Sequence, residues 1–226
     1  MNGSNCEVSW REDNVNRNQR LALVCPKLGR LQSFAASIRP TTMTHPVTGS
    51  IKHCKNCGSA VVLRHPDDGD TRLRAVCPAC HTVHYENPLN VVGTIPVWQD
   101  KVLLCKRNIE PRKGFWTLPA GFMELRETLA EGAARETDEE AGADIELQDL
   151  FTIIDVPRVG QVHFFFRAAL LSPEFNPGHE TQEARLFSQA EIPWDDLAFR
   201  TVKETLRCFF SDRDKGEFEL HTLAIH

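Results

Sequence analysis

One acidic segment constrains the fold of this chain more than any other. Residues 121–143 read GFMELRETLAEGAARETDEEAGA. From Thr128 to Ala141 the segment has no proline and is rich in alanine, and it is followed by Gly142, a usual residue at the end of a helix. The sequence therefore predicts a helix over residues 128–141.

The predicted helix has two different sides. At 100° per residue, one side carries small residues that can pack closely against a sheet. These residues are Ala130, Ala134, Thr137 and Ala141. Another side carries Glu136, Glu139 and Glu140, whose like charges repel one another. A solvated acidic face is the simpler interpretation, but oxygen ligands of this kind also suit a hard ion such as Mg²⁺ or Mn²⁺.

The order of residues in this segment favours the metal site. Gly121 is followed after five residues by Glu127, after seven more by Arg135 and Glu136, and then by two further glutamates and a glycine. This pattern resembles the Nudix box, the signature of the Nudix hydrolases. Thr137 replaces the aliphatic residue that is usual there, but a β-branched side chain of valine size fits the packing side.

The resemblance implies a fold, a reaction and a set of roles. The fold is an α/β/α sandwich with a mixed sheet, and the reaction is metal-dependent hydrolysis of a nucleoside diphosphate linked to another group. The carbonyl of Gly121 would lie near the metal, Arg135 would orient the glutamates, and a glutamate beyond the box would assist. For that last role we choose Glu183 over Glu180. The catalytic candidates are Glu127, Arg135, Glu136, Glu139, Glu140 and Glu183.

Two C-x-x-C pairs predict a second, structural metal site. Cys54 and Cys57 are separated by nineteen residues from Cys77 and Cys80, a spacing typical of a zinc ribbon with four thiolate ligands. Between the pairs, two short strands flank a turn at residues 66–70. We expect structural Zn²⁺ here.

Other interpretations of this module stay open. The cysteines could form disulfides, but the other four have no spacing pattern and no secretion signal is seen, so we expect a reducing, cytoplasmic location. Four histidines could replace a thiolate ligand. They are His53, His65, His81 and His84. Nearby lysines and arginines could contact nucleic acid, but only Tyr85 is placed for base stacking, so we expect no nucleic-acid partner.

The chain divides into three regions that differ in composition and residue pattern. Residues 1–45 lack periodicity, and we expect them to be disordered. They could be a flexible extension or a targeting peptide, or the start codon could be mis-assigned, with Met43 as the true first residue. Residues 46–88 form the predicted ribbon and residues 89–226 the Nudix domain. The net charge of −5 and the lack of a long apolar run argue against binding to a membrane. A homodimer is a partner that the resemblance allows.

Residues 89–226 show strands on both sides of the box helix. Strands are predicted at 91–98, 101–107, 143–156, 161–171 and 183–188, and residues 115–122 lead into the box. A closing helix is predicted at 195–210. Its inward residues are Leu197, Val202, Leu206, Phe209 and Phe210.

Several residues outside the box are candidates for binding a small dinucleotide substrate. Lys106 and Arg107 end a strand and could neutralise a diphosphate, although a solvated strand end is as good an interpretation. Phe115, Trp116 and Phe122 could stack on an adenine or flavin ring, although aromatic residues beside a sheet more often belong to the core.

The leaving group is predicted from a closer resemblance. A ribbon before a Nudix domain occurs in the NADH pyrophosphatases, whose SQPWPFPQS segment is absent here, and in a group similar to the plant plastid FAD pyrophosphatase. The second group is favoured by CPACHTVHYENP, KVLLCKRNIEPRKGFWTLPAGFMEL and AEIPWDDLAF. We therefore expect cleavage of FAD to FMN and AMP, with ADP-ribose, to which Pro157 points, or NADH as the alternative. A regulator that binds nucleotide or RNA without catalysis is disfavoured by the intact box.

Overall fold

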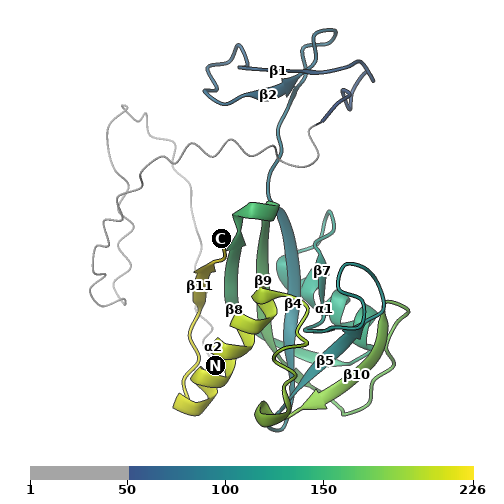
Figure 1. Ribbon diagram of the computed structural model, residues 1–226, viewed down its shortest axis with the longest axis vertical. Helices are drawn as coiled ribbons and strands as arrows, with labels where there is room; N and C mark the ends of the chain where they lie inside the picture. The colour runs from purple at the N-terminus through teal and green to yellow at the C-terminus, as the bar shows by residue number, and fades with distance from the viewer. Residues whose placement is uncertain (1–50) are drawn as a thin grey trace, which may run out of the picture. The chain divides into compact units, whose positions relative to one another are not determined.

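The structure is a computed structural model that describes residues 51–226 (Figure 1). The expectations for residues 1–45 lie outside the described residues. In the described part, no helix has both the length and the apolar character needed to cross a bilayer.

The N-terminal part of the described chain is a small antiparallel sheet. It contains β1 (Val62–Arg64), β2 (Arg74–Val76) and β3 (Val83–His84), in the order β1-β2-β3. The predicted hairpin between the two cysteine pairs is therefore confirmed, because β1 and β2 pair antiparallel across the turn. The third strand was not expected from the sequence.

The main sheet is mixed, as predicted. Its strand order is β10-β5-β4-β9-β8-β11, with the short β6 beside β5 and β7 beside β4. Only the pairs β4–β9 and β8–β11 are parallel along this order. The strands are β4 (Leu89–Trp98), β5 (Lys101–Arg107), β6 (Trp116–Thr117), β7 (Ala120–Phe122), β8 (Ile145–Val156), β9 (Gln161–Leu170), β10 (Thr181–Phe187) and β11 (His221–Ala224).

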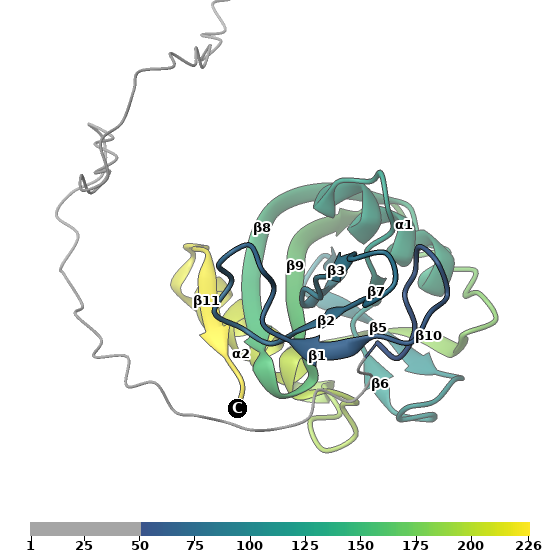
Figure 2. The same cartoon turned by 90° about the horizontal axis from the view of Figure 1, so that it is seen from above.

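The two long helices cover opposite faces of this sheet (Figures 1 and 2). Neighbouring residues of a strand point to opposite faces, so Phe165 of β9 packs in the core beneath α2 (Arg200–Lys215), while Phe166 packs with Ala133 of α1 (Leu129–Ala141). Short 3₁₀ turns at Pro157–Val159 and Gln189–Glu191 complete the connections. The expected sandwich of a mixed sheet between helices is confirmed.

Helix α1 begins and ends where its sequence predicts. Thr128 caps the N-terminus by accepting a hydrogen bond from the Glu131 N–H, and the Glu131 side chain accepts one from the Thr128 N–H. Gly142 ends the helix in the left-handed conformation with φ of 57°. These caps place the glutamates of the box at fixed positions along the helix.

The packing side of α1 differs from the predicted one by about one residue. Thr137 and Ala141 are buried as expected, but Ala133 is fully buried and Ala130 and Ala134 only partly. Gly132 approaches Val92 of β4 so closely that a methyl group there would contact its side chain. As a result, Glu136 and Glu140, which lie one and two turns beyond Gly132, border the sheet.

Helix α2 also differs from its predicted range. It spans Arg200–Lys215 instead of residues 195–210, because residues just before it pair with β6. Trp116 donates its N–H to the carbonyl of Asp196 and accepts a hydrogen bond from Ala198. The inward residues of the prediction are confirmed: four are buried, and Leu197 packs against the same core.

Candidate active site

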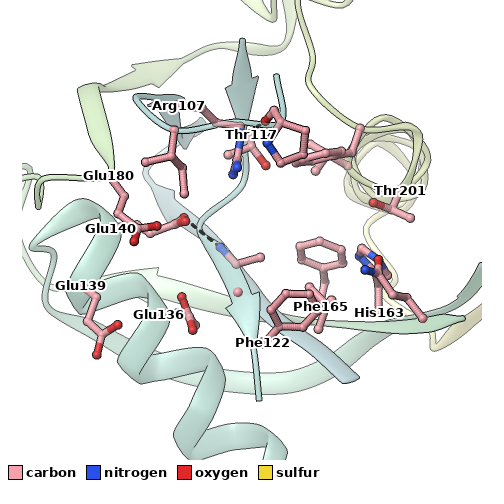
Figure 3. A pocket seen from close by; sticks show the side chains of 18 of the residues that line it. Arg107, Thr117, Phe122, Glu136, Glu139, Glu140, His163, Phe165, Glu180 and Thr201 are labelled. Carbon is pink, nitrogen blue, oxygen red and sulfur yellow. Dashed lines mark hydrogen bonds between the residues drawn. The ribbon is translucent and has the colours of Figure 1, made fainter. Parts of the chain in front are cut away.

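A cavity of about 690 Å³ opens between the carboxylates of α1 and a wall formed by β9 and α2 (Figure 3). Glu136, Glu139 and Glu140 line one side of the cavity. The predicted residues Gly121 and Arg135 line it as well. The structure therefore brings most of the box residues together around one space.

Arg135 connects the carboxylates of the box. Its guanidinium donates to both oxygens of Glu127, at 2.9 and 3.0 Å, to Oε1 of Glu136 at 2.8 Å and to Oε2 of Glu139 at 3.2 Å. A fifth hydrogen bond, of 3.2 Å, reaches the carbonyl of Phe122 on β7. The planar guanidinium thus fixes the loop before α1 and two of the glutamates in one arrangement.

Glu127 has a different environment from the other carboxylates of the box. Its hydrogen bonds from Arg135, and then the one from the Glu124 N–H, lower the pKa of Glu127 to about 2. The carboxylate of Glu127 is therefore ionised and already paired. This arrangement supports a positioning role for Glu127.

Glu136 and Glu140 are nearly buried, with residue exposures of 9% and 7%. Burial raises the pKa of Glu136, against the opposing effect of Arg135. Burial also raises the pKa of Glu140 to about 8, although its Oε2 accepts a hydrogen bond of 3.0 Å from the Ala120 N–H. Two nearly buried carboxylates, of which only Glu136 has a direct cationic partner, with Glu139 beside them, fit a divalent cation bound by oxygen ligands.

Arg107 and Phe122 are the two predicted substrate-binding residues that line the cavity. Arg107 faces the carboxylates from β5, and its guanidinium lies 5.1 Å from the ring centroid of Phe199. The ring of Phe122 is 53% exposed, so it is free to contact a ligand. A cation and an exposed aromatic ring therefore share the space with the glutamates.

The structure does not bring the other predicted substrate-binding residues to the cavity. Lys106 neighbours Arg107 on β5 and so points to the other face, where its ammonium lies 5.8 Å from the ring centroid of Trp116. Trp116 is 8% exposed and packs edge to face on Phe187 in the core. Phe115 lies outside the lining, with Arg112 over its ring.

The structure places Glu180, and not Glu183, beside the box glutamates. Glu183 is an exposed residue within β10, where it lies opposite Lys106 in the register with β5. Glu180 precedes that strand and lines the cavity, and its charge contributes to the raised pKa values of both buried glutamates. We therefore correct the choice of Glu183 to Glu180, because Glu180 lines the cavity with the box glutamates and Glu183 does not.

Sequence reasoning missed the opposite wall of the cavity. This wall includes His163 and Phe165 of β9 and Thr201 of α2 (Figure 3), together with Gln161, whose side chain contacts His163. The alternation of residues along β9 could have identified which of its side chains share a face. Nothing in the sequence indicates that the first turn of α2 lies next to them.

The four predicted zinc ligands also lie together. Their sulfur atoms are all within 4.8 Å of one another, and the Cys54–Cys80 and Cys57–Cys77 distances are 3.6 and 3.5 Å. Tetrahedral Zn²⁺ with bonds of about 2.3 Å requires S–S distances of about 3.8 Å. A hydrogen bond with the Thr82 hydroxyl lowers the pKa of Cys80 to about 5, which favours the thiolate form. The geometry and the donor set fit Zn²⁺.

The structure has a mixed sheet between two helices, and clustered carboxylates of one helix face a cavity. This is the Nudix fold that the resemblance implied. The comparison with known families agrees. The chain belongs to the Nudix family, because the family model described as the NUDIX domain matches residues 88–210, more than half of the chain. A second model, described as Nudix N-terminal, matches residues 52–86, which contain the cysteine cluster.

Two individual relatives are enzymes named for their substrates. The chain is 26% identical over 171 residues to the NAD-capped RNA hydrolase NudC of Vibrio parahaemolyticus, covering 74% of this chain and 64% of that protein. It is 31% identical over 130 residues to the ADP-ribose pyrophosphatase of Methanocaldococcus jannaschii, covering 54% of this chain and 76% of that protein. The chain thus spans less than two thirds of the Vibrio protein.

A solved structure supports the fold of the whole described region. The crystal structure of a NUDIX hydrolase from Nitrosomonas europaea is similar with a TM-score of 0.75 and 51% sequence identity. The match covers 77% of this chain and 99% of that chain.

Proposed function

We propose that this protein is a metal-dependent pyrophosphohydrolase that cleaves the phosphoanhydride bond of a dinucleotide, with FAD as the substrate and FMN and AMP as products. The observation that carries the proposal is the placement of two nearly buried glutamates and an exposed one in the same cavity as Arg107. Membership of the Nudix family supports the reaction class.

The residues of the site would have different roles. Glu136, Glu139 and Glu140 would hold the catalytic ions, Mg²⁺ or Mn²⁺, which would neutralise the pyrophosphate and lower the pKa of water when bound. Arg107, which lines the same cavity, would hold a phosphate oxygen.

The choice of FAD comes from the segments that resemble the plant plastid FAD pyrophosphatase group. The cavity volume of about 690 Å³ and the exposed ring of Phe122 are compatible with a large flat group. A second candidate, ADP-ribose, is favoured by the similarity to the Methanocaldococcus jannaschii protein. A third, NAD-capped RNA, is suggested by the relatives named NudC.

The test is a substrate panel with the purified full chain and Mg²⁺ or Mn²⁺. Values of kcat/KM are compared for FAD, ADP-ribose, NADH and an NAD-capped RNA. We expect FAD to be the best substrate by at least about tenfold, with FMN and AMP as products. Preference for another compound would replace FAD while keeping the reaction, whereas no hydrolysis of any of them would overturn the proposed activity.

A further inference from the structure

The wall of the cavity opposite the glutamates has no part in the chemistry described above. It is built from β9 and from the first turn of α2, and it carries the polar side chains of Gln161, His163 and Thr201. Figure 3 draws His163 and Thr201 on the side of the cavity away from Glu136 and Glu140, with Phe122 and Phe165 near them.

Two polar atoms of this wall have no hydrogen-bond partner. In the described part of the chain, three buried side-chain nitrogen or oxygen atoms lack a partner, and two of them are Nδ1 of His163 and Oγ1 of Thr201. Thr201 is only 5% exposed. Leaving a buried polar group unpaired is costly, so each such group needs an explanation, and a ligand that pairs with it is one. Both residues line a cavity large enough for a nucleotide.

The environment of His163 defines what its free nitrogen can bind. Burial lowers the pKa of His163 to about 4, so the ring is neutral at pH 7. Its Nε2 lies 3.0 Å from Oε1 of Gln161. In a neutral ring, Nε2 donates its hydrogen to that oxygen and Nδ1 is left as an acceptor. Gln161 therefore holds His163 in the form that accepts a hydrogen bond from a ligand N–H.

Thr201 complements this acceptor. A threonine hydroxyl can both donate and accept a hydrogen bond. It can therefore pair with a donor or with an acceptor that neighbours the N–H group of a ligand. The wall also offers aromatic surface, because Phe165 packs beneath it and the exposed ring of Phe122 lines the same cavity. A flat ring system with an N–H donor and a neighbouring acceptor on its edge would satisfy all of these groups.

We propose that Gln161, His163 and Thr201 form a subsite that binds the polar edge of the substrate's nitrogen heterocycle, at the end of the cavity opposite the metal-binding glutamates. The imide edge of a flavin and the amino edge of an adenine both have the required chemistry, whereas a sugar phosphate alone does not. This inference rests on the proposed function, because it assumes a nucleotide-linked substrate. His163 and Thr201 are specificity-determining residues, and Gln161 positions His163.

The test measures binding as well as hydrolysis. Affinities of FMN, AMP and ribose 5-phosphate for the full chain are compared for the wild type, Thr201→Val and His163→Phe. The wild type is expected to bind FMN or AMP at least about tenfold more tightly than ribose 5-phosphate, and each variant is expected to lose most of that preference. The mononucleotide whose affinity falls identifies the heterocycle. In hydrolysis of the preferred dinucleotide, KM is expected to rise about tenfold with little change in kcat.

The melting temperature separates this role from a structural one. Thr201→Val removes an unpaired hydroxyl, so it is expected to leave the melting temperature unchanged or raise it. Thr205→Val is the matched control one turn further along α2. The Thr205 hydroxyl is buried and lies 3.1 Å from that of Thr152, so this variant is expected to melt lower while KM and the mononucleotide affinities stay the same.

The outcomes distinguish the subsite from the activity. Unchanged affinities for FMN and AMP in both variants, or no preference of the wild type for either over ribose 5-phosphate, would overturn the subsite even if the protein hydrolyses dinucleotides. Loss of the preference in the variants, in a protein that hydrolyses none of the substrates, would support the subsite and overturn only the proposed activity.

Discussion

The backbone of Gly121 runs so close to Glu136 that a methyl group on Gly121 would overlap the Glu136 carboxylate. The carboxylate is the far end of a side chain, so it can move aside at little cost in stability. We therefore expect Gly121→Ala to reduce kcat/KM by about 100-fold, because small displacements of reacting groups have effects of that size. The melting temperature should change little, and both quantities are measured on the same preparation.

Gly93→Ala provides the contrast for that experiment. A methyl group at Gly93 would meet the carbonyl of Pro119 and the side chain of Ala120, which belong to the neighbouring chain segment and cannot turn away. This variant is expected to lose roughly 1–3 kcal/mol of unfolding free energy in urea. If Gly121→Ala destabilised the protein as much, the close approach would serve packing and not the placement of Glu136.

Glu140→Gln tests the metal-binding carboxylate with the least change in shape. The amide oxygen can still accept the hydrogen bond from the Ala120 N–H, so the melting temperature should be nearly unchanged. Mutation of residues that only hydrogen-bond to metal ligands typically lowers metal affinity or activity by about 10- to 100-fold. Loss of a ligand itself should therefore lower kcat/KM by roughly 100-fold or more. Asp138→Asn is the control, because it removes a charge from the exposed side of the same helix. Equal activity of both variants would falsify the role of Glu140.

Cys77→Ser tests the second metal site. Cys77 is completely buried within the cluster, and the zinc content of the purified protein should fall from about one ion per chain to near zero. Cys208→Ala is the control, because Cys208 lies in α2 and outside the cluster. Elemental analysis after gel filtration gives the result, and retention of zinc by Cys77→Ser would show that the remaining three thiolates suffice.

The stability of the fold should depend on pH through His163. Burial lowers the pKa of His163 to about 4, whereas an unfolded histidine has a pKa of about 6.5. Between these values the unfolded state binds a proton that the folded state does not, so the free energy of unfolding falls as pH falls from about 6.5 to about 4. Denaturation of the wild type and of His163→Gln at pH 7 and pH 5 measures this contribution.

The wild type should lose more stability than His163→Gln between those two pH values. The exposed His179 offers a matched substitution, and His179→Gln should follow the wild type. An equal loss in all three proteins would mean that His163 is protonated as readily in the folded state as in the unfolded one.

The parts of the molecule that the sequence predicts are those that depend on neighbours in the chain. The caps of α1 at Thr128 and Gly142 lie within the helix segment itself, and the cysteine pairs are each held by one tight turn. The spacing of the box also encodes which glutamates share a side of the helix. These features could be derived because local hydrogen bonding and helical periodicity determine them.

The features that the sequence does not predict depend on contacts between distant segments. The start of α2 is set by the pairing of Trp116 with residues 196–198, and β11 is parallel to β8 through contacts that no periodicity shows. The same reason explains Lys106 and Glu183, since the face to which a charged strand residue points depends on the sheet around it. The buried hydroxyl pair of Thr94 and Thr137, with oxygens 2.6 Å apart, also depends on such a contact.

The two walls of the cavity come from different stretches of the chain. Three of the glutamates that line the cavity lie in residues 136–140, whereas the opposite wall comes from residues 161–202. Substitutions in the second stretch can therefore alter which compound fits without disturbing the glutamates of α1. A protein built in this way can acquire a new substrate by small changes in one wall, and its descendants would keep the same reaction while diverging in what they degrade.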